Sequence, residues 1–149
     1  MDILRGMLMI ILVRLSRTMP VTFREGTARH NVVLMQQFEK LIEQHYREKR
    51  LPKEYAEMMF ITPNHLNAVT NSAVGKSAGE LIRERILLEA KRLLVNSDLM
   101  VSQIAELLHF EDNAYFTRFF KKYLGLTPEG FRYAYASDSL MSVTSLLPG

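Results

Sequence analysis

Apolar residues recur at three- and four-residue steps along much of this 149-residue chain, which is the spacing of one face of an α-helix. The first such run predicts an amphipathic helix over residues 1–17. Residues 18–35 include a proline, a glycine and several threonines, and they predict a linker. A helical pattern returns from Val32 and continues to Arg47, where a short basic run suits a helix C-terminus.

The amphipathic helix over residues 1–17 must bury its apolar stripe, and two interpretations stay open. It packs on its own chain, or it forms a dimer seam or the docking tail of a further domain. A secretory signal is not favoured, because Asp2 is acidic, Arg14 and Arg17 follow the apolar run, and no Ala-x-Ala-like site is present. The run is also far shorter than the ~20 residues that a membrane span needs.

Two segments in the second half of the chain resemble each other. The matched positions are Ala56 with Ala105, Glu57 with Glu106 and Gly75 with Gly125. The second copy is one residue longer, and the extra residue falls in or just after its turn. Each copy predicts a helix, a tight turn and a second helix, the helix-turn-helix geometry in which the second helix can enter a DNA major groove. The alternative is two ordinary helical hairpins.

The start of each second helix carries a capping signal. Thr62 is a good N-cap with Pro63 at the first helical position, and Asp112 is a candidate cap in the second copy. Apolar residues before the turn, within it and along the second helix predict the core of each copy. They are Met59, Ile61, Leu66 and Val69 in the first copy, and Leu108, Phe110, Phe116, Phe119 and Phe120 in the second.

A long helix connects the two copies. Ser77 and Glu80 form a capping box that opens it, and the helical pattern continues to Leu94. At ~1.5 Å per residue this helix is about 25 Å long. It could hold two second helices about one DNA turn, ~34 Å, apart. The fold class expected is all-α: two helix-turn-helix subdomains joined by a long central helix, with an extra N-terminal amphipathic helix.

Composition changes this picture little. Nineteen Lys and Arg against sixteen Asp and Glu give a net charge of +3, which is weak evidence for a nucleic-acid partner. The absence of cysteine excludes a disulfide scaffold, thiolate zinc sites and a cysteine nucleophile. No Gly-rich phosphate loop, metal-ligand spacing or nucleophile–base pair is present, so we expect no enzyme, no cofactor and no metal.

Several segments together resemble the signature of AraC/XylS-type transcriptional regulators over about residues 36–133. The segments are 85–94, Ile104-Ala-Glu106, 115–128 and Phe131-Arg132. The resemblance implies a double helix-turn-helix fold and a promoter-binding role, with RNA polymerase as a candidate partner. Many members also carry an N-terminal effector-sensing, dimerising domain, and helix 1–17 looks like the last helix of such a domain. The chain is then either a fragment or a short member without a sensor.

The chain departs from the family pattern at two places. The family usually has glycine in each turn, whereas this chain has Phe60 and His109. A positive φ is uncommon for bulky residues, so we expect either turn to be distorted. In the family, the second helix of the first copy is usually basic. Here residues 67–72 of that helix carry no charge, so we expect its contacts with DNA phosphates to be weak.

The candidate DNA-contacting residues lie toward the N-termini of the two second helices. Asparagine can bond adenine bidentately, arginine can read guanine, and lysine one turn later suits phosphate. Thr117 and Ala114 could touch a thymine methyl group. The candidates are Asn64, His65, Asn67 and Asn71 in the first copy, and Asn113, Ala114, Tyr115, Thr117, Arg118, Lys121 and Lys122 in the second. Tyr115 is equally a candidate core residue, and Arg118 could instead pair with Glu111 or Asp112.

The leading hypothesis is a sequence-specific DNA-binding transcriptional regulator that reads two successive major grooves of double-stranded DNA. We expect it to be cytoplasmic, not associated with a membrane, and homodimeric through residues 1–17. The alternative is a helical protein-interaction module that docks a partner through its N-terminal apolar helix. The DNA-binding domain is expected over residues 36–135, followed by a flexible, Ser- and Thr-rich tail over residues 136–149.

Overall fold

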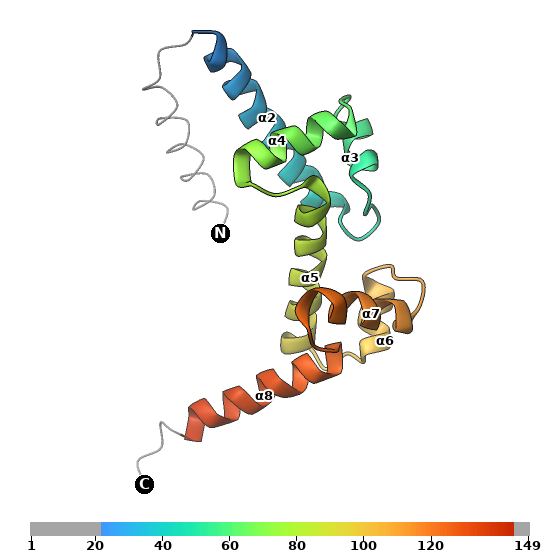
Figure 1. Cartoon of the computed structure of the whole chain (residues 1–149). Coiled ribbons are helices and arrows are strands. Elements are labelled where there is room, and N and C mark those ends of the chain that lie inside the picture. The colour runs from blue at the N-terminus through green and yellow to red at the C-terminus, as the bar shows by residue number, and fades with distance from the viewer. Residues whose placement is uncertain (1–21, 145–149) are drawn as a thin grey trace. The chain divides into compact units, whose positions relative to one another are not determined.

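The computed structural model describes residues 22–144, and the regular secondary structure in this part of the chain is all α-helix, without a strand (Figure 1). The helices are α2 (Thr22–His45), α3 (Pro52–Met58), α4 (Pro63–Val74), α5 (Ala78–Asn96), α6 (Val101–Leu107), α7 (Asn113–Leu124) and α8 (Pro128–Thr144). The all-α prediction is confirmed. The α3–α4 and α6–α7 pairs are the two predicted helix-turn-helix copies, and α5 is the connecting helix.

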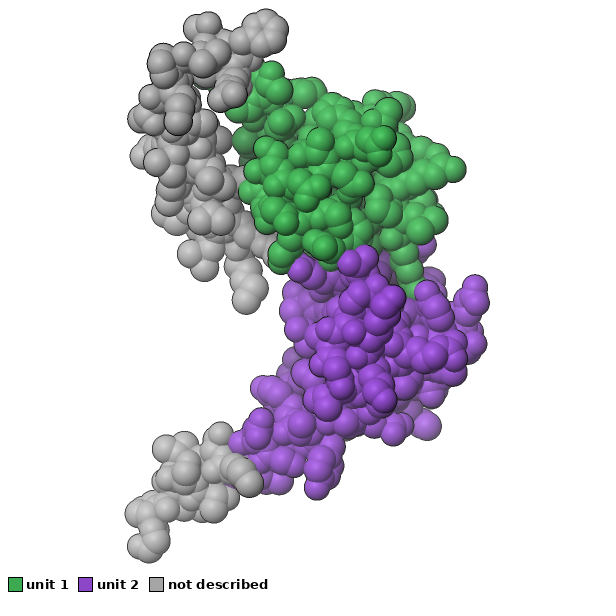
Figure 2. All heavy atoms as spheres, viewed as in Figure 1, with its two compact units in different colours: residues 1–45, 49–82 green, residues 46–48, 83–149 purple. Residues whose placement is uncertain are grey.

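The chain divides into two compact units, coloured separately in Figure 2. Unit 1 contains residues up to His45 and Lys49–Ile82, and therefore holds α2, α3 and α4. Unit 2 contains Tyr46–Glu48 and the chain from Arg83 onward, and holds α6, α7 and α8. The division falls inside α5, so each unit has its own helix-turn-helix pair and its own part of the connecting helix.

The core of unit 1 forms where α3 and α4 pack against α2. The ring of Phe38 meets that of Tyr55 edge-on, with ring centroids 5.5 Å apart. Ala56 is completely buried, as expected where two helices approach closely. The Tyr55 hydroxyl donates a hydrogen bond of 2.8 Å to the Lys49 carbonyl. Burial, and secondarily the charge of Glu54, raises the pKa of this hydroxyl.

The expected linker over residues 18–35 is wrong from Thr22 onward, because α2 begins there. Leu34 and Met35 are buried and continue the apolar stripe of α2 toward the N-terminus. Extending an existing helix adds one hydrogen bond for each residue fixed, whereas starting a helix is unfavourable. The packed half of α2 therefore supports the N-terminal turns of the helix, in spite of their weak apolar pattern.

The capping box predicted for α5 is confirmed. The Glu80 amide donates to Ser77 Oγ at 3.2 Å, and the Ser77 amide donates to the Glu80 carboxylate at 3.2 Å. This reciprocal pair satisfies two of the backbone donors that a helix start leaves without intrahelical partners.

The core of unit 2 is aromatic. Phe110 lies 5.0 Å from Phe116 and 5.2 Å from Phe119, measured between ring centroids. Phe120 stacks edge-on against Phe131 at 5.6 Å, which ties the start of α8 to α7. Arg132 of α8 donates to the Leu94 carbonyl at 3.0 Å and thereby satisfies a carbonyl near the C-terminus of α5.

The tail expected over residues 136–149 is wrong as far as Thr144, because α8 runs through that segment. The Gly130 amide donates to Thr127 Oγ1 at 3.0 Å, and this contact caps the start of α8. Tyr133 and Tyr135, in the first half of α8, are exposed.

Helix 1–17, with its expected roles in packing or dimerisation, lies outside the described residues. Within residues 22–144, no helix combines the length and apolar character that crossing a bilayer requires.

Candidate nucleic-acid interface

Both helix-turn-helix turns have the same hydrogen-bond pattern. In the first, the Ile61 amide donates to the Ala56 carbonyl at 3.1 Å and the Phe60 amide to the Glu57 carbonyl at 3.2 Å. In the second, the amides of Phe110 and His109 make the equivalent bonds of 2.9 and 3.0 Å to residues 105 and 106. These are the paired contacts of the Schellman motif, which ends a helix with a residue in the left-handed region.

The expected distortion of these turns is wrong. Phe60 and His109 both take a φ of 57°, and both turns keep their regular hydrogen bonds. The side chain of Phe60 is 94% exposed and His109 is also exposed, so each turn adopts the left-handed conformation without inserting the bulky side chain into the core.

The helices that follow these turns match in length and in their caps. The Thr62 hydroxyl accepts from the His65 amide at 3.1 Å, and Asp112 Oδ1 accepts from the Tyr115 amide at 2.6 Å. Both predicted N-caps are therefore confirmed. Each helix has 12 residues and ends at a left-handed glycine, Gly75 or Gly125. Residues that lie 50 positions apart thus occupy equivalent places on α4 and α7.

Most of the predicted contact residues lie on the exposed faces of these two helices. The buried faces are anchored by Leu66 and Val69 in α4 and by Phe116 and Phe120 in α7. The exposed candidates are Asn64, His65 and Asn71 on α4, and Asn113, Ala114, Tyr115, Arg118, Lys121 and Lys122 on α7. Within each unit, the structure therefore brings the predicted residues together on one accessible helix face.

Asn67 has a different role from the other candidates. Its side chain is half-buried, and its Oδ1 accepts a hydrogen bond of 3.0 Å from the Ala78 amide at the start of α5. The Thr70 hydroxyl donates to the Asn67 carbonyl at 3.2 Å. The expected base contact by Asn67 conflicts with this geometry, because the Asn67 amide side chain serves as a cap for α5. Thr117, its equivalent in α7, is also half-buried.

Tyr115 and Arg118 each had an alternative interpretation. Tyr115 takes an intermediate position, with 46% of its surface exposed and its ring 5.6 Å from Phe110. Arg118 is exposed and has no ion pair with Glu111 or Asp112 in the described part of the chain. Its guanidinium group is thus available to a ligand.

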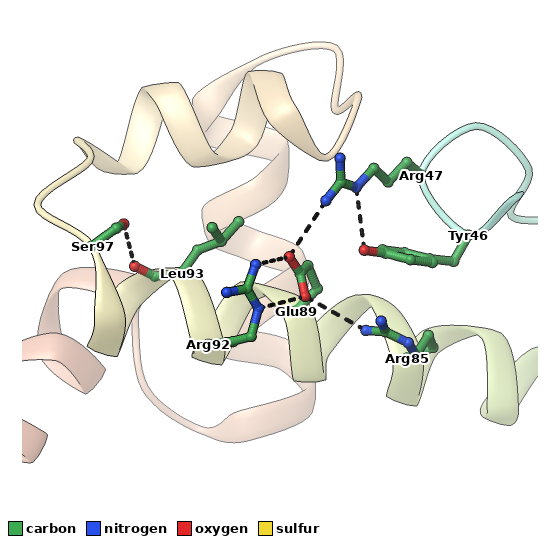
Figure 3. Close-up of polar contacts among 7 residues, drawn as sticks. All are labelled: Tyr46, Arg47, Arg85, Glu89, Arg92, Leu93 and Ser97. Carbon is green, nitrogen blue, oxygen red and sulfur yellow. Dashed lines mark hydrogen bonds and ion pairs between the residues drawn. The ribbon is translucent and has the colours of Figure 1, made fainter. Parts of the chain in front are cut away.

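A cluster of charged residues in unit 2 was missed by the sequence analysis (Figure 3). Glu89, on α5, is only 4% exposed and contacts three arginines. Arg92 donates to both of its carboxylate oxygens at 3.0 and 2.6 Å, and Arg85 and Arg47 lie 3.7 and 3.5 Å away. The hydrogen bonds from Arg92 lower the pKa of Glu89 against the opposing effect of burial, and the three arginine charges lower it further.

Tyr46 completes the cluster. The Arg85 guanidinium lies over its ring, 4.3 Å from the centroid, and the Arg47 Nε donates to its hydroxyl at 3.2 Å. The (i, i+3) and (i, i+4) spacings of Arg92 and Arg85 around Glu89 were visible in the sequence. The participation of Tyr46 and Arg47, about 40 residues earlier in the chain, had no local sequence signal.

Two capped helix-turn-helix pairs in tandem define the class of protein. A family model described as a helix-turn-helix domain matches residues 55–134, more than half of the chain. The chain therefore belongs to this helix-turn-helix family, of the AraC type that the sequence resembled.

Similar proteins agree with this assignment. PqrA of Proteus vulgaris, named as a probable transcription factor, is 40% identical over 68 residues, which are 46% of this chain and 56% of PqrA. The C-terminal domain of the two-component response regulator YesN from Fusobacterium nucleatum superposes with a TM-score of 0.61 at 26% identity, covering 66% of this chain and 96% of that domain.

A third similar protein is the DNA-binding domain of the transcription factor AdpA, solved with a target DNA, which has the same fold. Its TM-score is 0.61 at 23% identity, and the match covers 70% of this chain and 94% of that one. The chain spans about half or less of the length of the curated relatives that it matches.

Proposed function

We propose that this chain is the DNA-binding part of a transcriptional regulator, and that α4 and α7 enter two successive major grooves of double-stranded DNA. The observation that carries the proposal is that each unit presents a capped second helix whose outer face is polar and accessible. The target DNA solved with the AdpA domain supports the same ligand class. No catalytic step is part of this proposal.

The exposed residues of α7 divide into two kinds of contact. Arg118 lies in the middle of the accessible face, where its planar guanidinium can bond guanine O6 and N7. Asn113, Ala114 and Tyr115 lie in the first turn of α7, and the proposal assigns them contacts with base edges or the sugar–phosphate backbone. Lys121 and Lys122 lie in the last turn and suit phosphate oxygens.

An electrophoretic shift with mixed genomic fragments tests the proposal. We expect retarded complexes at low salt, and at moderate salt we expect only a subset of fragments to remain bound, because specific contacts survive when counterion release weakens. A chain that retards no fragment at either salt concentration is instead a protein-interaction module. The uncharged face of α4 is the observation that favours this second candidate.

The partners beyond DNA remain proposals for the whole protein. A promoter-binding regulator acts in the cytoplasm and meets RNA polymerase, and the apolar stripe within residues 1–17 favours a homodimer. Light scattering across a range of concentrations tests the homodimer, and a monomer at the highest concentration contradicts it.

A further inference from the structure

The matched registers of α4 and α7 allow their outer faces to be compared position by position. Both helices have 12 residues between an N-cap that bonds the third amide and a left-handed glycine. Ala68 is therefore equivalent to Arg118, Asn71 to Lys121 and Ser72 to Lys122. All six of these side chains are exposed.

The two faces differ completely in charge. Residues 63–75 contain no Lys, Arg, Asp or Glu. Residues 113–125 contain three cations and no acidic residue. Lys121 and Lys122 lie in the last turn of α7, where positive charge interacts favourably with the negative end of the helix dipole. Any counterion release from the second helices therefore comes from α7 alone.

The outer face of α4 carries groups that fit one type of base pair. Asn64 and Asn71 present carboxamides, which bond bidentately to adenine N6 and N7. Ala68, between them on the same face, presents a methyl group that can contact the thymine methyl. Asn67 is excluded from this set because its carboxamide caps α5. The face contains no Arg or Lys to read guanine.

We propose that α4 recognises a short run of A·T base pairs through uncharged contacts, while α7 supplies the cationic contacts, so that the DNA site has two chemically different halves. This inference rests on the proposed function. From Asn64 to Asn71 the helix rises about 10 Å. Base pairs are stacked 3.4 Å apart, so the face of α4 spans about three pairs.

His65 is the side chain beside this face that could also bond a guanine acceptor. It is exposed in the first turn of α4, and its backbone amide is engaged by the Thr62 cap. The proposal assigns it no base contact. A Gln37→Ala variant, which removes an exposed carboxamide from α2, is the matched control for changes to Asn64 and Asn71.

The test is selection of bound duplexes from a random DNA pool, using the full 149-residue chain. We expect one half of the selected site to contain about three A·T pairs. Replacing each with G·C should weaken binding about fivefold or more. An Asn64→Ala/Asn71→Ala double variant should lose the preference in that half only. Arg118→Ala should relax the preference in the other half, and Gln37→Ala should leave the A·T preference unchanged. Circular dichroism confirms that each variant is folded.

A second variant tests the division of roles in the opposite direction, by adding positive charge to α4. Ala68→Arg with Asn71→Lys copies two of the three charges of α7, those of Arg118 and Lys121, onto α4. We expect stronger binding to random duplexes, a dependence of log K on log salt that is steeper by about 2, and loss of the A·T preference, because Asn71 and Ala68 are replaced.

The outcomes separate the two proposals. A selected site without an A·T-rich half, or an A·T preference that survives in the double variant, overturns the division between α4 and α7 while DNA recognition stands. Selection that yields no sequence preference at all overturns the proposed function, and this inference with it.

Discussion

Phe60 and His109 occupy a backbone conformation that ordinarily favours glycine, since both have a φ of 57°. For an L-residue this left-handed conformation costs about 1 kcal/mol. The rest of the turn holds the backbone in this conformation despite the cost. The backbone hydrogen bonds of the turn and the burial of neighbouring residues such as Met59 both depend on it. The sequence identified the two residues as unusual for this position, but only the structure shows that they adopt the left-handed conformation.

The first prediction concerns this strain. Phe60→Gly should raise the free energy of unfolding by about 0.5 kcal/mol, because relief of the left-handed strain exceeds the added flexibility of the unfolded chain. Phe60→Ala is the control: it also removes the exposed ring but keeps the strained backbone, and it should show no gain. Urea titration measures both variants, and an equal gain in the two would assign the effect to the ring.

The second prediction concerns Asn67, whose side chain connects α4 to the start of α5. Asn67→Ala should lower the free energy of unfolding by about 1 kcal/mol, because the Ala78 amide loses its acceptor. Asn71→Ala, on the exposed face of the same helix, should change it by less than about 0.5 kcal/mol. Thermal unfolding of the two variants side by side checks the contrast, and equal effects would contradict a capping role.

The third prediction concerns Glu89, a buried carboxylate among three arginines. Glu89→Gln should destabilise the fold by about 3 kcal/mol at neutral pH, because it leaves Arg47, Arg85 and Arg92 without their common counter-charge. The pKa of Glu89 is lowered in the folded state, so its contribution is fully present above the ordinary carboxyl pKa and is lost as the pH falls through the lowered value.

The wild-type chain should accordingly lose more stability on acidification from pH 5 to pH 3 than Glu89→Gln does. Glu106→Gln changes an exposed carboxylate on α6 and serves as the control. Urea titrations across this pH range give the comparison. Parallel pH profiles for the wild type and Glu89→Gln would show that Glu89 does not titrate differently on folding.

At the scale of secondary-structure elements, local sequence signals predicted the helices and their ends well. Thr62, Asp112 and the Ser77–Glu80 box act within three residues along the chain, and all three caps are present in the structure. The start of α2 was missed because its first turns are supported by packing further along the same helix. The extent of α8 was missed because the sequence from residue 136 onward is rich in serine and lacks the apolar periodicity that marks a helix.

The fourth prediction separates two roles on α7. Arg118→Ala should cost about 1–3 kcal/mol on a specific duplex and relax the preference at one base pair. Lys122→Ala should weaken binding to all sequences alike and reduce the salt slope by about 1. Lys40→Ala, on α2, is the control and should change neither. Fluorescence anisotropy measured across salt concentrations distinguishes the two roles. If Arg118→Ala lowered the affinity for random and specific DNA equally, Arg118 would be a phosphate contact.

At the scale of the whole molecule, the two units share one helix, and each has its own helix-turn-helix pair and its own core. Under the proposed function, one chain contacts two half-sites at the same time. Binding of both halves then depends on their spacing along the duplex as well as on their sequences.

The fifth prediction tests this joint binding. Inserting five base pairs between the two halves of a selected site rotates one half by roughly half a helical turn. We expect the affinity to fall to that of a duplex in which one half is scrambled. The measurement is a competition titration of the intact, inserted and scrambled duplexes. If the inserted duplex binds as well as the intact one, a single helix-turn-helix unit is responsible for recognition.

The sequence by itself determined the features that depend on neighbours close along the chain: the amphipathic helices, their caps, and the repeat with its extra residue in the second copy. These depend on hydrogen bonds and apolar spacings that span at most a few residues. The tertiary structure decided the contacts between distant segments, such as Arg47 with Glu89 and Asn67 with the start of α5. A polar side chain can cap, pair or face solvent with equal local propensity, and only its position in the folded chain determines which of these it does.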